Sequence, residues 1–259
     1  MIVDCHTHLG VAPGDTTEAE QAHERACAGL DAALVLERRG KDRAGARKQL
    51  VRYLQSRAPM HGLAAINPTE DKIGVRGLTG LRDEGFRGVV LYCCEDGFHP
   101  THSRAMRLYE SAAEMQLPVF FHNGGPFATG AMIEYAQPFL LDEVARRFPT
   151  LKIIIGRMGL PFVPQTLALL AKHPNVYADL TIRPRRVWEV YNLVVNASEA
   201  GVMNKLLFGS GFPDNDPGHC METLLGFNRL LADTKLPTVP REQLRGIIER
   251  DTLAELGLS

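Results

Sequence analysis

The sequence lacks several features that mark specialised classes of protein. It has no apolar run close to the roughly 18 residues that a membrane-spanning helix needs, and its first residues do not show the basic start and apolar stretch of a secretory signal. Its five cysteines are odd in number and irregularly spaced, so a disulfide framework is not expected. We therefore expect a cytoplasmic protein with reduced thiols.

An excess of charge of one sign is also missing. The chain has 29 basic and 30 acidic residues, for a formal net charge of −1. This balance favours neither nucleic acid nor a membrane surface as a partner. With 259 residues, of which 45% are hydrophobic, the chain can bury one large core, and we expect a single domain over residues 1–259.

The sequence does contain a repeated alternation of short apolar runs and amphipathic segments. The runs are rich in Val, Ile, Leu and Phe, as strands buried on both faces are, and lie at residues 2–5, 33–36, 62–66, 88–92, 118–121, 152–155, 176–178 and 205–208. The pattern predicts a helix that opens at a capping box, Thr17 to Glu20. It predicts further helices at 103–115, 134–147, 165–172, 186–200, 241–250 and 252–256.

This order of strand and helix implies parallel strands joined by crossover helices. Eight such units in one chain of this length favour a single (β/α)8 barrel, with an open doubly wound sheet as the alternative. No glycine-rich phosphate-binding signature follows any run, which counts against the dinucleotide-binding form of that open sheet.

Histidines follow two of the predicted strands at the end where such barrels place their active sites. His6 and His8 end the first strand, and residues two apart on a strand share one face. His122 ends the fifth. Three imidazoles can hold one zinc ion and leave a position for water or substrate. The alternatives are polar residues in a strand-to-loop turn for the pair and a hydrogen-bonded core histidine for His122.

At this point the sequence resembles the amidohydrolase-related family that includes aminocarboxymuconate-semialdehyde decarboxylase. The resemblance spans the chain and rests on these segments: D-C-H-T-H at residues 4–8, the segment around His122, FPTLKIIIGRMGLP, NVYADL, KLLFGSGFP and GIIERDTLAELGL. It implies a (β/α)8 barrel with one divalent metal ion, usually zinc. It also implies hydrolysis or non-oxidative decarboxylation of a small acid.

Two departures from the family pattern affect the expected chemistry. Arg157 stands where the family carries a histidine after the sixth strand, and Gly211 stands where it carries an aspartate after the eighth. In the family that aspartate contacts the metal and moves the proton of its bound water, while the histidine polarises water or substrate. The three metal-binding histidines remain, whereas this acid/base pair is missing.

Other charged residues near the strand ends are candidates for the lost roles. Arg157 and Arg183 are predicted to bind a substrate carboxylate, because a guanidinium pairs with it in a two-pronged fashion. Asp214 and Asp216 are predicted as replacement bases, although their segment also reads as a turn and helix start. Asp179, at the end of the seventh strand, is expected to pair with an arginine at least as readily as to act in catalysis.

Two functional hypotheses follow. The first is a metal-dependent hydrolase or carbon–carbon lyase that acts on a small carboxylate or cyclic amide. The second is a catalytically degraded homologue, with the metal ion retained or absent, which binds a small molecule or serves as the non-catalytic partner of an active paralogue. Both predict a small anionic substrate or ligand, and both leave a homo- or hetero-oligomer open.

Overall fold

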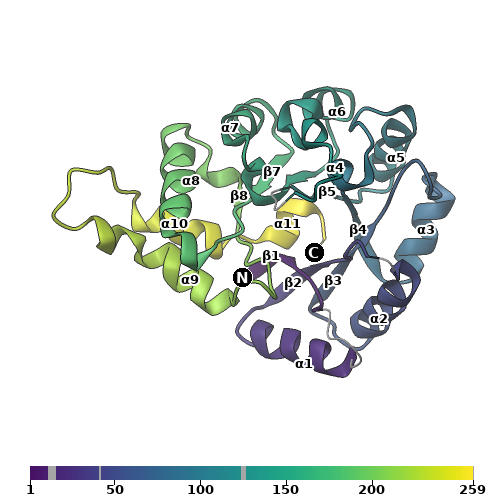
Figure 1. Ribbon diagram of the computed structural model, residues 1–259, viewed down its shortest axis with the longest axis horizontal. Coiled ribbons are helices and arrows are strands. Elements are labelled where there is room, and N and C mark those ends of the chain that lie inside the picture. The colour runs from purple at the N-terminus through teal and green to yellow at the C-terminus, as the bar shows by residue number, and fades with distance from the viewer. Residues whose placement is uncertain (11–15, 41, 124–126, 259) are drawn as a thin grey trace.

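Eight short parallel strands follow one another in chain order around one sheet, with helices outside them (Figure 1). The structure is a computed structural model that describes residues 1–10, 16–40, 42–123 and 127–258. The strands are β1 (Val3–Thr7), β2 (Ala32–Leu36), β3 (Met60–Ala65), β4 (Phe86–Leu91), β5 (Val119–Phe121), β6 (Ile153–Ile155), β7 (Val176–Asp179) and β8 (Leu206–Leu207). Each of the eight predicted strands is therefore confirmed, to within a few residues at its ends.

Backbone contacts between β8 and β1 close the sheet into a barrel. The amide of Cys5 donates to the carbonyl of Phe208 at 2.8 Å, and the amide of Gly211 donates to the carbonyl of His6 at 2.8 Å. A parallel bridge joins Thr7 and Phe212 beyond them. The prediction of a single (β/α)8 barrel is confirmed, and the open-sheet alternative is wrong because both edge strands are paired.

Apolar side chains fill the barrel in the alternating pattern that parallel strands impose. One side-chain cluster occupies the interior and includes Leu34, Leu36, Leu63, Val90 and Phe120. A larger cluster lies between the strands and the surrounding helices. This second layer explains why the strands are apolar on both faces and could be recognised as continuous runs.

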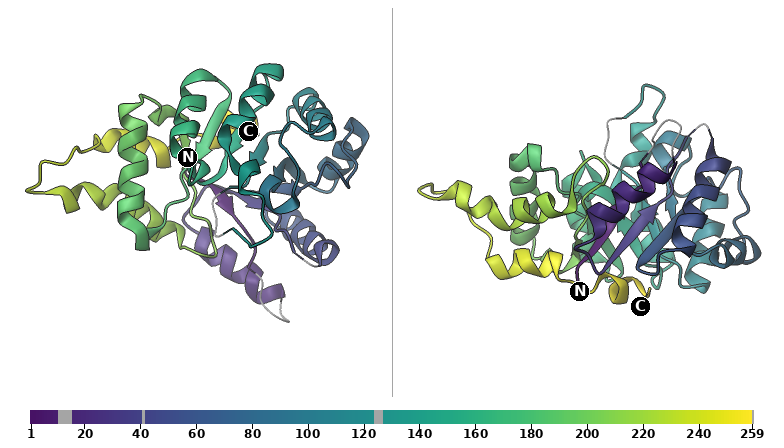
Figure 2. Two further views of the ribbon diagram at one scale, coloured as in Figure 1. Left: turned by 45° about the horizontal axis from the view of Figure 1, so that its top comes forward. Right: turned by 90° about the horizontal axis from the view of Figure 1, so that it is seen from below.

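The helices surround the strands and one covers the end of the barrel where the strands begin. The helices are α1 (Thr16–Cys27), α2 (Arg43–Gln55), α3 (Val75–Asp83), α4 (Cys93–Asp96), α5 (Ser103–Glu114), α6 (Leu141–Arg147), α7 (Val163–Lys172), α8 (Val187–Glu199), α9 (Pro217–Gly226), α10 (Arg241–Ile248) and α11 (Thr252–Leu256). Short 3-10 turns are η1 (Ile133–Ala136), η2 (Pro138–Leu140), η3 (Gly156–Gly159), η4 (Pro184–Arg186), η5 (Met203–Lys205) and η6 (Phe227–Leu231). Helix α11 packs Leu253 and Leu256 against the interior cluster, beside the chain termini (Figure 2).

Three details differ from the sequence expectations. The segment 134–147 forms η1, η2 and α6 in place of one helix, because Pro138 lacks the amide that a continuous helix would need there. Helix α1 begins at Thr16, so Thr17 lies inside its first turn. Helices α2, α3, α4 and α9 were not predicted; α3 carries Gly77 and Gly80, which weaken its helical signal.

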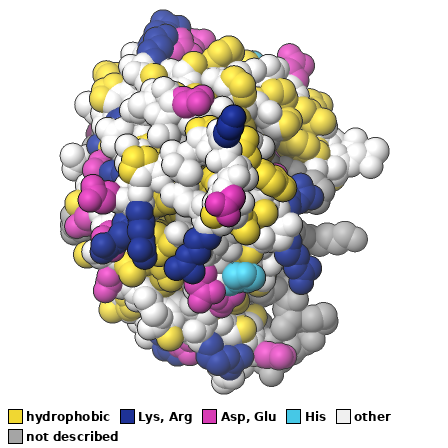
Figure 3. Space-filling model, turned by 90° about the vertical axis from the view of Figure 1, so that its left-hand side faces the viewer, with side chains coloured by type: hydrophobic (Ala, Val, Ile, Leu, Met, Phe, Trp, Pro, Cys, Tyr) yellow, Lys and Arg dark blue, Asp and Glu magenta, His cyan; other side chains and the backbone are white. Residues whose placement is uncertain are grey.

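The segment from α9 to α10 projects from the barrel wall at the left of Figure 1. Trp188 of α8 and Leu230 and Leu236 of the projecting segment are 59%, 62% and 43% exposed. The face of the molecule on this side shows hydrophobic side chains among charged ones (Figure 3). All five cysteines are free and buried, as the absence of a disulfide pattern predicted. Within the described residues, no helix is both long and apolar enough to cross a membrane.

Candidate metal and substrate site

Three histidines meet at the end of the barrel where the strands finish. His6 lies in β1, His8 follows it and His122 follows β5, and their ligand atoms all lie within 4.8 Å of one another. The Nε2 atoms of His6 and His8 are 3.3 Å apart. The three predicted metal ligands are thus brought together from two strands on opposite sides of the barrel.

A register irregularity in β1 places the first two imidazoles. Cys5 belongs to the interior cluster, so strict alternation would point His6 and His8 away from the barrel axis. The pairing with β2 shifts between Asp4 and Thr7, where three steps along β1 match two along β2. This extra residue turns both histidines towards the axis, as β-bulges do beside functional sites.

The Nδ1 atoms of His6 and His8 face away from the cluster, and both form hydrogen bonds. Nδ1 of His6 lies 2.6 Å from Oδ2 of Asp179, and Nδ1 of His8 lies 2.8 Å from the carbonyl oxygen of Leu36. Both oxygens accept a hydrogen bond, so each Nδ1 donates, and each Nε2 faces the cluster, where it presents a lone pair when the ring is neutral. Partners of this kind orient metal-binding histidines and raise their basicity.

His122 is held by packing. Its ring lies 4.6 Å from the ring of Tyr92, and the Tyr92 hydroxyl donates to the carbonyl of Glu37 at 2.8 Å. Its Nδ1 is buried without a hydrogen-bond partner among the residues that the structure describes. Burial, followed by the charge of His6, lowers the pKa of both His8 and His122 well below the usual range. Both rings are therefore neutral near pH 7, as metal ligands must be.

These features fit a divalent metal ion. Two nitrogens at the zinc–nitrogen distance of about 2.0–2.1 Å from a tetrahedral ion lie about 3.3 Å apart, which agrees with the 3.3 Å between the Nε2 atoms of His6 and His8. The buried, unsatisfied Nδ1 of His122 is the kind of polar atom that an ion at this position would account for. Three neutral imidazoles suit zinc and other transition metals.

Asp179 has a different role from the one expected. Its carboxylate accepts hydrogen bonds from the His6 ring, from the backbone amide of Arg157 at 3.0 Å and from the amide of Thr181 at 2.8 Å. Burial alone would raise the pKa of Asp179, but the charge of His6 and these hydrogen bonds lower it below its usual range. The expected pairing with an arginine side chain is replaced by orientation of a candidate metal ligand.

Asp4 is a buried carboxyl that sequence reasoning did not single out. Its Oδ1 accepts from the amides of His6 and Ser210, both at 3.0 Å, and so links β1 to the chain after β8. Burial raises its pKa to about 7. The only sequence signal for Asp4 was its position two residues before His6 in the opening motif. That position does not distinguish a metal ligand from a structural carboxyl.

Arg157 and Gly211, which the sequence analysis predicts to depart from the family pattern, lie close together. A Cβ atom built on Gly211 would stand 3.9 Å from Nη2 of Arg157 and only 2.9 Å from Cγ2 of Thr181. Gly211 has a φ of 68°, in the left-handed region that glycine adopts at little cost. The guanidinium therefore borders the space that an aspartate at 211 would enter, and both the backbone and Thr181 oppose a side chain there.

The remaining predicted residues differ in their contacts and in their distance from Arg157. Asp214 lies 3.7 Å from Nη2 of Arg157, with its side chain 66% exposed. Asp216 caps helix α9 by accepting from the amide of His219 at 3.0 Å, so the helix-start interpretation accounts for it. Arg183 pairs with Glu189, which offsets the positive charge it was expected to contribute at the barrel mouth.

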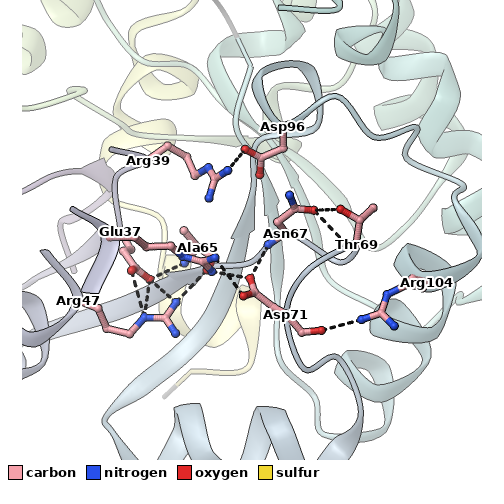
Figure 4. A network of polar contacts seen from close by, with 10 residues as sticks. Glu37, Arg39, Arg47, Ala65, Asn67, Thr69, Asp71, Asp96 and Arg104 are labelled. Atoms are coloured by element: carbon pink, nitrogen blue, oxygen red, sulfur yellow. Dashed lines mark hydrogen bonds and ion pairs between the residues drawn. The ribbon is translucent and has the colours of Figure 1, made fainter. Parts of the chain in front are cut away.

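A second polar network surrounds the ends of β2 and β3 (Figure 4). Arg47 forms a two-pronged pair with buried Glu37, and Arg43 pairs with Asp71. Both arginines also donate to the carbonyl of Ala65. Both arginines line a groove of about 1140 Å³ between α2, α3 and α5. None of the three histidines lines this groove, so we do not assign the reaction to it despite its size.

Comparison with known families gives a clear assignment. A family profile described as amidohydrolase matches residues 3–249. The chain belongs to the amidohydrolase family. The resemblance inferred from the sequence motifs is confirmed. Among curated protein sequences, none matches the chain.

Solved structures share the whole fold at low sequence identity. A probable 2-pyrone-4,6-dicarboxylic acid hydrolase from Acinetobacter baumannii, solved with citric acid bound, is 14% identical with a TM-score of 0.69 over 99% of both chains. A 5-carboxyvanillate decarboxylase from Sphingomonas paucimobilis is 10% identical with a TM-score of 0.65, over 100% of this chain and 99% of that one. Another from Novosphingobium aromaticivorans, with bound manganese, is 13% identical with a TM-score of 0.62, over 96% and 82%.

Proposed function

We propose that this amidohydrolase-family protein is a metal-dependent hydrolase or non-oxidative decarboxylase of a small carboxylate or cyclic amide. The observation that carries the proposal is the buried cluster of His6, His8 and His122, within 4.8 Å of one another, with the outer nitrogens of the first two already engaged. These three residues would hold one divalent ion, which we take to be zinc. A bound ion supplies a Lewis acid that polarises a carbonyl or carboxyl oxygen.

Arg157 is the proposed substrate-binding group. Its side chain is 12% exposed and lies at the barrel mouth, beside Gly211. An arginine cannot serve as a base near neutral pH, but its planar fork can hold a carboxylate with two hydrogen bonds. A substrate anion at this point would also offset the repulsion between the guanidinium and a metal ion.

Asp214 is the proposed proton carrier. Its carboxylate is exposed and stands beside Arg157, so it can take the proton of an attacking water in hydrolysis or return a proton to carbon in decarboxylation. Asp216 is less suited, because capping α9 already engages its Oδ1. Asp179 is less suited because it holds His6. In this scheme Arg183, paired with Glu189, has at most a secondary part in substrate binding.

One set of observations favours the alternative of a degraded homologue. The chain has no carboxyl side chain at Gly211 and no imidazole at Arg157, and the side chain of Asp214 is 66% exposed. General acid and base groups contribute about 10²–10⁴-fold each, so these losses bear directly on turnover. The alternative retains ligand binding in the barrel mouth, with or without an ion, and predicts no reaction.

The deciding experiment measures metal content and turnover together. The protein is purified without chelator, analysed by mass spectrometry for bound metals, and assayed after zinc or manganese addition for CO₂ release and for lactone and amide hydrolysis. His122→Ala is compared with His219→Ala, which removes an exposed histidine of α9. We expect near-stoichiometric metal and turnover, both lost in the His122 variant alone. Ligand binding without turnover supports the alternative, and absence of metal after reconstitution contradicts the proposed enzyme.

A further inference from the structure

The groove between α2, α3 and α5 carries more positive than negative charge. Among the described residues, three acidic side chains line it and so do six basic ones, which are Arg43, Arg47, Lys72, Arg76, Arg104 and Arg107. Asp71 pairs with Arg43, and Glu37, which does not line the groove, pairs with Arg47. Four basic groups then remain against two acidic ones, although the whole chain has a formal net charge of −1.

Arg104, the second residue of α5, is held in position by carbonyl oxygens. Its Nε donates to the carbonyl of Pro68, and its Nη2 donates to the carbonyl of Asp71 at 2.8 Å (Figure 4). No carboxylate within the described ranges pairs with Arg104, so its positive charge is not neutralised. A guanidinium has five N–H donors, and three remain here. Because Arg104 is already oriented, an anion can bind it with little further loss of side-chain freedom.

Three further basic side chains border the groove without an ion pair to any residue that the structure describes, and they are Lys72, Arg76 and Arg107. Arg107 lies three residues after Arg104 and so shares its face of α5. Lys72 precedes α3, and Arg76 is the second residue of that helix. An anion in the groove can therefore be contacted from α5 and from α3.

Helix α3 presents glycine to the groove at every third residue. Gly74, Gly77 and Gly80 all line it. Local packing explains Gly77, since a Cβ there would stand 2.7 Å from the carbonyl oxygen of Lys72. A Cβ on Gly80 would meet nothing within 4 Å, so packing does not require glycine at this position inside a helix, where glycine is unfavourable. Its effect is to keep the groove open and to let a ligand approach the backbone.

Charge and size indicate the chemistry of a ligand for this groove. The excess of two positive charges matches a phosphate group, which carries about −1.5 to −2 near pH 7. Guanidinium groups also suit phosphate oxygens, which they bind with two parallel hydrogen bonds. The volume of about 1140 Å³ is at the upper end of small-molecule pockets, which hold about 300–1,000 Å³. The groove therefore has room for an organic group, and Ile73 and Leu81 give it apolar surface.

We propose that this groove is a second binding site, separate from the barrel mouth, which takes the phosphate group of a small molecule. Arg104 and Arg107 of α5 and Arg76 of α3 bind the phosphate oxygens, and the organic part lies along the glycines of α3. None of the three histidines lines the groove, so binding here is independent of the proposed reaction.

Calorimetric titration of the full chain, as purified and in a phosphate-free buffer of constant ionic strength, tests the site. The probes are inorganic phosphate, ribose 5-phosphate and ribose. Arg104→Ala and Arg107→Ala are compared with Arg82→Ala, which removes an exposed arginine of α3 that does not line the groove. Gly80→Leu fills the groove without removing charge, and His122→Ala reports any phosphate that binds at the barrel mouth. Circular dichroism verifies that each variant is folded.

We expect ribose 5-phosphate to bind at least about tenfold more tightly than ribose. Arg104→Ala should weaken phosphate binding about 10- to 100-fold, as loss of hydrogen bonds to a charged group does. Arg107→Ala, which breaks no contact within the protein, should weaken it at least about threefold. Arg82→Ala and His122→Ala should bind as the unmodified protein does, and Gly80→Leu should weaken ribose 5-phosphate more than inorganic phosphate.

The two phosphate probes distinguish the sources of the ligand. Tighter binding of ribose 5-phosphate supports a phosphate ester, and equal affinity supports free phosphate at the same site. Three results would overturn the inference: absence of phosphate binding, equal losses in Arg82→Ala and the two α5 variants, and loss in His122→Ala with binding kept in both α5 variants. The last result would place the phosphate at the barrel mouth.

Discussion

The strand ends at the barrel mouth differ in how tightly they hold their functional groups. At the ends of β1, β5 and β7, each histidine is buried or nearly so, and Asp179 accepts hydrogen bonds from the His6 ring, from the amide of Arg157 and from both the amide and the hydroxyl of Thr181. At the ends of β6 and β8, Arg157 has the mostly exposed Asp214 at 3.7 Å, and Gly211 presents no side chain. The groups proposed to hold an ion are therefore pre-organised, whereas the groups proposed to complete the reaction are more exposed and have fewer contacts.

The largest expected effect is on the free energy of unfolding, and it concerns His23, which packs behind the two histidines of β1. His23 of α1 is buried, and its ring nitrogens contact the Tyr53 hydroxyl at 2.8 Å and Oγ1 of Thr7, between the two β1 histidines, at 2.9 Å. Burial lowers the pKa of His23 to about 4. The unfolded chain, with an ordinary pKa near 6.5, therefore takes up the proton first, so stability is complete above about pH 6.5 and falls towards pH 4.

Comparison of the unmodified protein with His23→Gln measures this contribution. The shift in pKa corresponds to about 3 kcal/mol. The free energy of unfolding, measured with urea, should fall between pH 7 and pH 4 in both proteins. The fall should be about 3 kcal/mol smaller in His23→Gln than in the unmodified protein. His219→Gln, on the surface of α9, should follow the unmodified protein. Identical pH slopes in all three proteins would show that His23 does not support the site in this way.

The next effect concerns Gly211, which follows β8. Gly211→Ala places a Cβ 2.9 Å from Thr181 at a φ of 68°, and a left-handed residue with a Cβ costs about 1–2 kcal/mol before any contact is counted. We expect the free energy of unfolding to fall by about 2–3 kcal/mol. Gly246→Ala in α10, where a Cβ has open space, should instead be neutral or stabilise by up to about 1 kcal/mol. If Gly211→Ala were as harmless as Gly246→Ala, an aspartate could be introduced at position 211 without backbone strain.

The smallest effect sharpens the role of Asp179. Asp179→Asn keeps one acceptor oxygen but removes the negative charge, so we expect about tenfold weaker zinc binding. Both carboxylate oxygens accept from backbone amides, so the asparagine NH2 would face a backbone N–H and the free energy of unfolding should also fall, by about 1–3 kcal/mol. Competition with a chromophoric chelator measures the affinity. Asp142→Asn, which removes the same charge from a pair with Lys172 on the barrel surface, serves as the matched variant. Unchanged zinc affinity in Asp179→Asn would reduce Asp179 to a purely structural residue.

Much of the fold could be predicted because most strand residues are buried on both faces of the sheet. The runs at 33–36 and 153–155 are apolar throughout, and their order allows few topologies. Prediction failed where local signals conflicted. Pro138 breaks an otherwise helical segment, and the glycines of α3 obscured a helix that tertiary packing supports.

The site was partly predictable for a related reason. His6, His8 and His122 follow recognisable strands, and the barrel topology alone places such residues at one end. Asp179 was assigned the wrong partner, because its distance in the chain from His6 hides the contact across β7, β8 and β1. Asp216 and Arg183 stay candidates by residue type, and only the structure shows that Asp216 caps α9 and that Arg183 pairs with Glu189.

The sequence by itself determined that this chain forms an eight-unit barrel of the amidohydrolase family and carries three histidines at strand ends, and it predicts that Arg157 and Gly211 replace the usual histidine and aspartate. These properties are local, since each depends on which residue follows which strand. Only the tertiary structure decided that a bulge in β1 turns two imidazoles inward, that Asp179 orients one of them, and that Arg157 borders the space beside Gly211. Those relations depend on register and on barrel closure, which bring together side chains far apart in the chain.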